Sequence, residues 1–285
     1  KDVSYPVCEM LSKADARIVL IDKENSGVSA TRNLGMRMAR GKYLQFVDAD
    51  DTLEPFATEL LVQRAEDNNA DLVIAAYNRI VPYKPKKEAK LDPLLPNKKK
   101  QLTEQLAKFQ TFGFLPMGFM TKEEFACGLM QEPASFYYGV MWNKLYRAEV
   151  WKLLHYPEGR LHEDDFVAHR LFWRCDKVVC LPDVLYNYRL RSGSIMRTSL
   201  KPGAFDAVDG LADRYRFYVE NGADRSVIDS AYAACWRRYL FLCAKVRQNP
   251  EPQLVKAISK EQFLMQGLIL SLIHISEPTR RSYIS

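Results

Sequence analysis

The sequence predicts an α/β fold with a mostly parallel sheet flanked by helices. Three short runs rich in apolar and β-branched residues have the length of buried strands: 17–22, 43–47 and 71–77. Segments 30–39 and 56–67 lie between these runs and have the apolar spacing of helices. Strands that alternate with helices are typical of a largely parallel sheet with helices on its faces.

Later parts of the chain favour helices. Thr121 and Glu124 have the spacing of a capping box, which predicts that a helix begins just after Thr121. Beyond residue 201 the pattern is helical in three long segments: 205–217, 227–246 and 252–269. These segments predict a C-terminal helical extension that covers one side of the domain or rests on a membrane face.

The composition is that of a globular protein with one α/β domain and an appendage. The chain has 285 residues, of which 47% are hydrophobic and 27% charged, enough to bury a sizeable core. It contains no run of about 18 apolar residues, the length that would predict a membrane-spanning helix. The six cysteines include no C-x-x-C pair, which argues against a disulfide scaffold or a zinc site and favours a reducing cytoplasm.

The predicted strand at 43–47 leads into an acidic tip that contains Asp48, Asp50 and Asp51. Carboxylates so close together repel one another unless a cation lies among them. Asp48 and Asp50 share one side of an extended backbone, where oxygen ligands suit a Mg²⁺ or Mn²⁺ ion that also holds a diphosphate. The alternative is a solvated turn that starts the next helix, with Asp51 or Thr52 as its N-cap.

Residues 24–51, ENSGVSATRNLGMRMARGKYLQFVDADD, resemble the central motif block of family-2 glycosyltransferases, which are inverting enzymes of the GT-A fold. The resemblance implies that Asp48 and Asp50 hold Mn²⁺ or Mg²⁺ together with a nucleotide-sugar. It also implies that Arg32 binds the phosphate or the nucleobase, whereas the alternative for Arg32 is an arginine on the helix surface. Asn33, also in the nucleotide-binding set, is expected to orient the loop backbone.

A second acidic cluster, Glu163, Asp164 and Asp165, precedes a predicted helix at 166–174. Transfer of a sugar requires a base that takes the proton of the acceptor hydroxyl. By resemblance, Asp164 is this base and Glu163 is its catalytic neighbour, while Asp165 is a competing assignment. The alternative is that all three residues only compensate the dipole at the start of the helix.

Two further segments carry the resemblance. Residues 142–147 match a segment that lines the acceptor side in this family, although Trp142 is more often a core residue on physical grounds. Residues 186–197 resemble a late segment whose arginines and hydroxyls close over the leaving diphosphate, which implies roles for Arg189, Arg191 and Ser194. The alternative for this segment is a surface β-ribbon with scattered arginines.

The two ends of the chain suggest a fragment. By resemblance, Lys1 and Asp2 are the last residues of a D-G-S-x-D motif, so Asp2 is a nucleotide-binding carboxylate whose neighbouring strands lie upstream. Residues 270–285 are similar to a translated sequencing-library adapter and are not expected to belong to the native fold. The expected organisation is a GT-A domain over 1–200 without its first strands, a helical region over 201–269 and a non-native tail over 270–285.

Residues 82–100 are rich in lysine and proline and are predicted to form an exposed insertion. Such a loop could contact an anionic membrane or a pyrophosphate-linked acceptor, or it could be a solvated loop alone. Tyr83 is its one possible base-stacking side chain, so the pattern argues against nucleic acid as a partner.

The function that these patterns predict is inverting transfer of a sugar from a nucleotide-sugar, expected to be UDP-linked, to a saccharide or lipid-linked saccharide in surface polysaccharide synthesis. We expect a cytoplasmic protein with peripheral contact at the inner membrane face. Two alternatives stay open: a nucleotidyltransferase, which should carry a Gly-rich phosphate loop near its start, and a non-catalytic module that binds sugar nucleotides.

Overall fold

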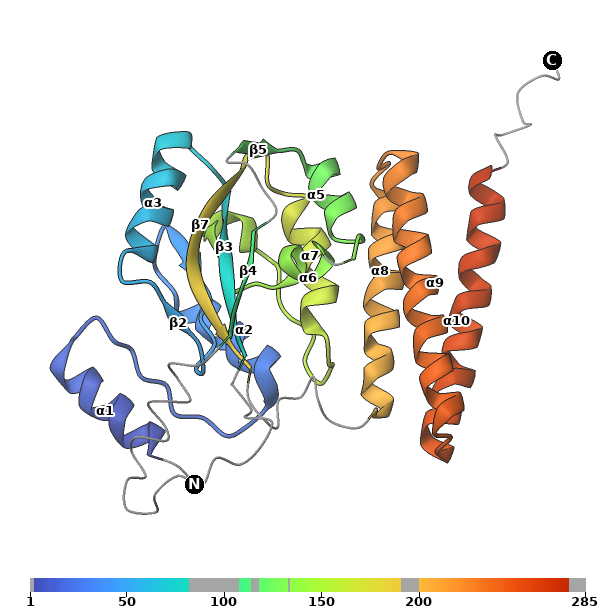
Figure 1. Cartoon of the computed structure of the whole chain (residues 1–285), viewed down its shortest axis with the longest axis horizontal. Helices are drawn as coiled ribbons and strands as arrows, with labels where there is room; N and C mark the ends of the chain where they lie inside the picture. The colour runs from blue at the N-terminus through green and yellow to red at the C-terminus, as the bar shows by residue number, and fades with distance from the viewer. Residues whose placement is uncertain (1–2, 82–107, 114–117, 133, 191–199, 277–285) are drawn as a thin grey trace.

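The computed structural model describes residues 3–81, 108–113, 118–132, 134–190 and 200–276. A seven-stranded sheet lies at its centre, helices cover both faces of the sheet, and a bundle of long C-terminal helices stands beside this body (Figure 1). The predicted α/β class with a C-terminal helical region is therefore confirmed.

The sheet is mixed, and it has the order β1-β6-β3-β7-β2, with β4 on β3 and β5 on β7. β3 and β7 are parallel, and β6 runs antiparallel to both β1 and β3. β1, β3 and β7 therefore run in the same direction, and their carboxyl ends meet at one edge of the sheet. The strands are β1 (Tyr43–Gln45), β2 (Thr52–Leu53), β3 (Leu72–Val81), β4 (Lys108–Phe112), β5 (Gly118–Met120), β6 (Lys144–Arg147) and β7 (Val178–Arg189).

The expectation of a mostly parallel sheet is corrected for the described strands. β2, β4, β5 and β6 all pair antiparallel with their neighbours. The apolar pattern of a strand indicates how deeply the strand is buried, but it does not encode which neighbour the strand will have or in which direction that neighbour runs.

Helices lie on both faces of the sheet. α3 covers one face, α5, α6 and α7 cover the other, and α8, α9 and α10 follow beyond them (Figure 1). The helices are α1 (Ser4–Ala14), α2 (Gly27–Met38), α3 (Ala57–Asn68), α5 (Lys122–Gly128), α6 (Ala134–Gly139), α7 (Glu163–Phe172), α8 (Asp206–Glu220), α9 (Arg225–Gln248) and α10 (Pro252–Ser276), with short 3₁₀ helices η1 (Ala148–Trp151) and η3 (Pro202–Phe205).

The core has two parts, separated by the sheet. Leu72 and Ile74 of β3 pack into the larger part, with α5 to α9, whereas Val73 and Ala75 pack against α3 on the opposite face. This alternation follows from the two-residue period of a strand. α5 begins as predicted, because Thr121 and Glu124 form a capping box.

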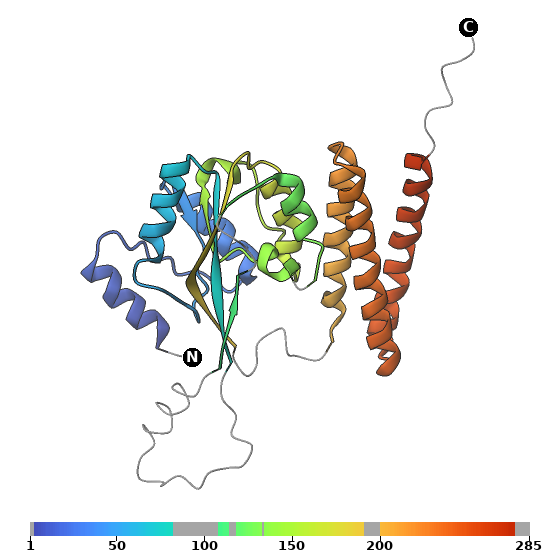
Figure 2. The same cartoon turned by 45° about the horizontal axis from the view of Figure 1, so that its top comes forward.

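Residues 17–22 contradict the prediction of a strand. No described strand pairs with them, and Ile18, Val19 and Ile21 are 42%, 69% and 39% exposed. α1, which precedes them, buries none of its residues and stands away from the sheet in both views (Figures 1 and 2). An apolar run becomes a strand only where a neighbour takes up its backbone hydrogen bonds, and the described residues provide none.

The start of α2 also differs from the prediction. The helix begins at Gly27, three residues before the expected start at residue 30. Gly27 has a φ of +86°, a conformation that glycine adopts without strain. At the other end of the chain, α10 continues to Ser276 and so includes the first residues of the segment expected to be an adapter-derived tail. Among the described helices, none has the length and apolarity needed to cross a membrane.

Candidate active site

Aromatic packing holds the segment that leads from β1 to the acidic tip. Phe46 makes edge contacts with the rings of Tyr146, Trp151 and Tyr156, at centroid distances of 5.9, 5.2 and 6.1 Å. Each such pair stabilises a structure by about 0.5–1.5 kcal/mol beyond the area it buries. Asp48 follows two residues later, so this packing fixes its position at the carboxyl edge of the sheet.

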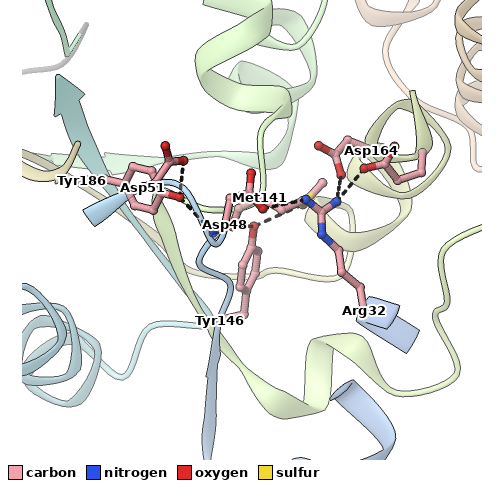
Figure 3. A network of polar contacts seen from close by, with 8 residues as sticks. Arg32, Asp48, Asp51, Met141, Tyr146, Asp164 and Tyr186 are labelled. Carbon is pink, nitrogen blue, oxygen red and sulfur yellow. Dashed lines mark hydrogen bonds and ion pairs between the residues drawn. The ribbon is translucent and has the colours of Figure 1, made fainter. Parts of the chain in front are cut away.

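Arg32, on α2, connects the two acidic motifs (Figure 3). Its guanidinium donates to Glu163 Oε1 at 2.7 Å and to Asp164 Oδ1 at 3.0 Å, and it pairs with Asp48 Oδ1 at 3.3 Å. The Arg32 side chain is 12% exposed, and its guanidinium lies 5.3 Å from the centre of the Tyr156 ring. The alternative of a helix-surface arginine is therefore wrong, and residues far apart in the sequence meet around one cation.

Asn33, the next residue, holds the loop that carries Tyr156. Its Nδ2 donates to the Tyr156 carbonyl at 2.9 Å, and its Oδ1 accepts from the Tyr156 N–H at 2.8 Å. The side chain is buried, so it orients the loop backbone and does not present its amide to the open site. The ring beneath Arg32 owes its place to this pair of hydrogen bonds.

Asp51 is tied to β7 and does not cap a helix. Its Oδ2 accepts from the hydroxyl of Tyr186 at 2.7 Å, and its Oδ1 accepts from the N–H of Arg189 at 2.8 Å. The same Tyr186 hydroxyl accepts from the N–H of Asp48 at 3.2 Å, which links both ends of the acidic tip (Figure 3). The alternative of a turn that starts a helix is wrong, because β2 intervenes and α3 begins only at Ala57.

The Tyr186 link also affects the charge of the acidic tip. Burial raises the pKa of Asp51 to about 6, although the hydrogen bonds from Arg189 and Tyr186 oppose this rise. Near pH 6 the Asp51 carboxyl therefore gains a proton more easily than an ordinary aspartate does. Asp50 lies beside it and is half-buried.

Asp164 lies in the first turn of α7, with Glu163 before it. The residue that precedes them, His162, adopts the left-handed conformation with φ of 56°, which turns the chain sharply into the helix. Burial raises the pKa of Asp164 to about 7, while Arg32 opposes the rise and Glu163 adds to it. A carboxyl whose pKa lies near neutrality is suited to take a proton from a hydroxyl and later to release it.

Asp165 faces a different partner. Its Oδ1 accepts from Arg214 of α8 at 3.1 Å, and Arg214 is 1% exposed. Asp164, by contrast, points toward Arg32 and Asp48 (Figure 3). Asp165 is therefore engaged with the helical region, whereas Asp164 borders the acidic tip.

The segment 142–147 lies beneath the site. Trp142 is buried and stacks on Tyr186 and Tyr188 at 4.3 and 5.3 Å between ring centres. Lys144 is fully buried, and its ammonium donates to the carbonyls of Tyr137 and Val140 and to the side-chain oxygen of Asn143. Both residues support the floor of the site as parts of the core.

The remaining predicted residues are only partly placed. Arg189 ends β7, its side chain is exposed, and its backbone N–H is the group that contacts the acidic tip. Asp2, Arg191 and Ser194 lie outside the described residues, as does the basic stretch at 82–100.

Oxygen donors for a hard cation stand at the tip of β1. Among the described residues, no group of three or more His, Cys, Asp or Glu side chains is arranged to hold a metal. Asp48 and Asp50 are carboxylates and fit a divalent cation such as Mn²⁺ or Mg²⁺, whose other ligands would come from a diphosphate and water. Such an ion would compete with Arg32 for Asp48.

The sequence alone does not identify Tyr186 or Arg214 as site residues. Tyr186 lies inside a recognised segment, so its position was signalled, but its contact with Asp51 joins residues 135 positions apart. Arg214 is one arginine in an amphipathic helix and has no local pattern that distinguishes it. Contacts of this kind depend on the tertiary fold.

The chain is similar to known glycosyltransferases in sequence and in fold. Residues 1–126 match the model of the family described as glycosyl transferase family 2. Two glycosyltransferases of Streptococcus pneumoniae are similar to the chain: GlyA, 28% identical over 78% of this chain and 29% of its own length, and GlyG, 28% identical over 80% of this chain and 70% of its own length. EpsH of Bacillus subtilis is 31% identical over 69% of this chain and 51% of its own length.

A solved structure shares the fold. S. aureus TarS, residues 1–349 in complex with UDP-GlcNAc, superposes with a TM-score of 0.62 over 90% of this chain and 67% of that chain, at 14% sequence identity. The chain thus spans only part of several relatives that it matches, from 29% of GlyA to 51% of EpsH and 70% of GlyG.

Proposed function

We propose that this chain, which belongs to glycosyltransferase family 2, transfers a sugar from a nucleotide-sugar to an acceptor hydroxyl with inversion at the anomeric carbon. The observation that carries the proposal is the meeting of the two acidic motifs around Arg32, within 3.3 Å of Asp48 and 3.0 Å of Asp164. One motif offers oxygen ligands for a metal ion that would also bind the diphosphate, and the other offers a base.

Asp164 is the base in this proposal. Its carboxylate accepts the proton of the acceptor hydroxyl as the hydroxyl oxygen attacks the anomeric carbon, and the bond from that carbon to the diphosphate breaks on the opposite side. Burial raises the pKa of Asp164 to about 7, so its carboxylate accepts a proton from a hydroxyl more readily than an ordinary aspartate would. Glu163 keeps Arg32 in place beside it at 2.7 Å.

Asp48 and Asp50 would hold Mn²⁺ or Mg²⁺. When bound, the cation neutralises the charge that develops on the leaving diphosphate. Arg32 is then free to leave Asp48 and to contact a phosphate oxygen, for which a guanidinium is well suited. Arg189, and the positions Asp2, Arg191 and Ser194 outside the described residues, complete the nucleotide-binding set that we propose.

The donor that we propose is UDP-linked, and the acceptor a saccharide or lipid-linked saccharide in surface polysaccharide synthesis. The complex of TarS with UDP-GlcNAc supports the choice of nucleotide. We place the reaction in the cytoplasm, with peripheral contact at the inner face of the membrane. We propose residues 1–200 as the transferase domain, 201–269 as the helical region and 270–285 as a non-native tail.

The test is nucleotide release from UDP-sugars by the protein that carries these residues, with Mn²⁺ or with EDTA. An Asp164→Asn variant should lose UDP release, while Asp176→Asn, an exposed aspartate on the loop after α7, should keep it. Release that requires Mn²⁺ and disappears in Asp164→Asn supports the proposal. Metal-dependent UDP binding without turnover would instead favour a non-catalytic binding module. Release of pyrophosphate in a parallel assay that supplies UTP and a sugar 1-phosphate would favour a nucleotidyltransferase.

A further inference from the structure

One face of α8 lies along the turn that carries Glu163 and Asp164. Asp206, Gly210 and Arg214 are spaced by four residues, so they line a single face of the helix. Each of them contacts the chain just before or just after the two carboxylates. The contacts form a row that brackets the turn.

The first contact precedes the turn. Asp206 Oδ2 accepts from the backbone N–H of Leu161 at 2.9 Å, and its Oδ1 accepts from Arg160 at 2.7 Å. Arg160 also donates to Asp209 at 2.8 Å. A carboxylate that holds both a backbone N–H and a neighbouring guanidinium fixes the direction in which the chain enters α7.

The middle contact is a close approach of the two helices. A Cβ atom built on Gly210 would lie 2.9 Å from the Cβ of Asp165 and 3.3 Å from its carbonyl carbon. Those distances are shorter than ordinary contacts, so any side chain larger than hydrogen would displace the first turn of α7. The glycine thus permits α8 to pack directly against the first turn of α7.

The last contact is buried. Arg214 donates through one terminal nitrogen to the Oδ1 of Asp165 at 3.1 Å and to its carbonyl oxygen at 3.4 Å, and through the other to the carbonyl of Leu129 at 3.2 Å. A buried ion pair contributes little net stability, because removal of both charges from water offsets their attraction. Its distinctive property is geometric: it fixes both the side chain and the backbone of Asp165 in one arrangement.

We propose that Arg214 is a positioning residue for the transfer reaction, and that the face of α8 formed by Asp206, Gly210 and Arg214 sets the orientation of Asp164. Consecutive residues of a helix point about 100° apart, so holding Asp165 against α8 turns Asp164 toward Arg32 and Asp48. The inference rests on the proposed function, because it assumes that Asp164 is the base. In this proposal the helical region orients a catalytic group in addition to packing against the domain.

The test compares Arg214→Met and Arg214→Lys with a matched control in the same helix pair. Arg170 of α7 pairs with Asp213 of α8 at 2.8 Å, so Arg170→Met removes another ion pair between the two helices, one that is more exposed and does not involve the first turn of α7. In Arg214→Met we expect kcat to fall by about tenfold to a hundredfold, the range that a misplaced catalytic group produces, with the KM for the UDP-sugar and the Kd for UDP unchanged. Arg214→Lys should recover part of kcat, and Arg170→Met should keep kcat.

Gly210→Ala is a second, independent variant. Alanine favours a helix by about 1 kcal/mol over glycine, so helix propensity does not disfavour the variant. Its methyl group would nevertheless displace the first turn of α7, which carries Asp164. We expect the same fall in kcat without a change in KM. This variant decides the question if Arg214→Met does not fold.

Three outcomes would overturn the inference. They are an unchanged kcat in a folded Arg214→Met or Gly210→Ala protein, a parallel loss of UDP affinity, or an equal fall of kcat in Arg170→Met, which would indicate general packing of α7 on α8. A wild-type protein without any UDP release would refute the proposed function itself, whereas a wild-type protein that turns over beside a fully active Arg214→Met variant refutes only the positioning role.

Discussion

Replacement of Arg32 with methionine should destabilise the protein and make that destabilisation depend on pH. Methionine keeps an unbranched apolar side chain of similar length but removes the guanidinium that joins Asp48, Glu163 and Asp164. Three carboxylates would then share a site without their cation. The expected effect has two parts, a loss of stability and a change in its pH dependence.

The structure sets the size of the loss. Removal of one partner of a buried ion pair costs about 3–5 kcal/mol, because the other partner is left without compensation. The side chains of Glu163, Asp164 and Asp48 are 15%, 27% and 36% exposed, so water screens part of their charge. We therefore expect the free energy of unfolding to fall by about 3 kcal/mol at pH 8, the lower end of that range.

The pH dependence follows from the pKa of Asp164. Burial raises it to about 7, above the ordinary value of 3.8, so the folded protein binds a proton there before the unfolded chain does. Stability from this group therefore increases as the pH falls through 7, because the unfolded state binds fewer protons in that range. A protonated Asp164 no longer needs Arg32, so the cost of Arg32→Met should be smaller at pH 5 than at pH 8.

Urea unfolding at the two pH values measures both parts. Arg37 lies on the same helix, and its side chain is exposed, so Arg37→Met controls for the loss of a helix arginine. Arg32→Lys should be intermediate, because an ammonium cannot reproduce the fork of a guanidinium. A cost that is equal at pH 5 and pH 8, or a cost no larger than that of Arg37→Met, would refute the reasoning.

Three further changes test other parts of the site and the fold. Tyr186→Phe removes the hydroxyl between Asp51 and the Asp48 N–H, so it should lower the free energy of unfolding in urea by about 1 kcal/mol. It should also raise the Mn²⁺ concentration needed for half-maximal UDP release. An unchanged Mn²⁺ requirement would contradict this prediction. Lys144→Met leaves buried acceptors unpaired and should cost about 1–3 kcal/mol in the same assay, whereas a neutral result would show that the acceptors find other donors. Thr121→Ala breaks the capping box of α5 and should lower the free energy of unfolding by about 1 kcal/mol. Thr121→Ser is the conservative control, and equal losses in the two variants would contradict the prediction.

Local patterns were sufficient for the elements that depend on local forces. The capping box at Thr121 and Glu124 was readable because its partners are three residues apart. The central strand was readable because residues 72–77 are buried on both faces, which produces an unbroken apolar run. The acidic motifs were recognisable because several carboxylates close together in the sequence need a nearby positive charge.

Other features depended on neighbours that a sequence pattern does not reveal. Residues 17–22 have the composition of a strand, yet no described strand pairs with them, and Ile18, Val19 and Ile21 are exposed. The mixed direction of the sheet arises from β6, which lies antiparallel between β1 and β3. In each case the apolar pattern does not specify the hydrogen-bond partner, and that partner decides whether a strand forms and in which direction its neighbour runs.

The choice between Asp164 and Asp165 shows how tertiary contacts resolve what composition leaves open. The two residues are adjacent, chemically identical and equally placed to compensate the helix dipole. The fold gives each its own arginine: Arg32 reaches Asp164 from α2, and Arg214 reaches Asp165 from α8. The carboxylate of Asp164 is thereby held beside the acidic tip, and that of Asp165 is held toward the helical region. The proposal that Asp164 is the base therefore rests on the direction in which each carboxylate is held.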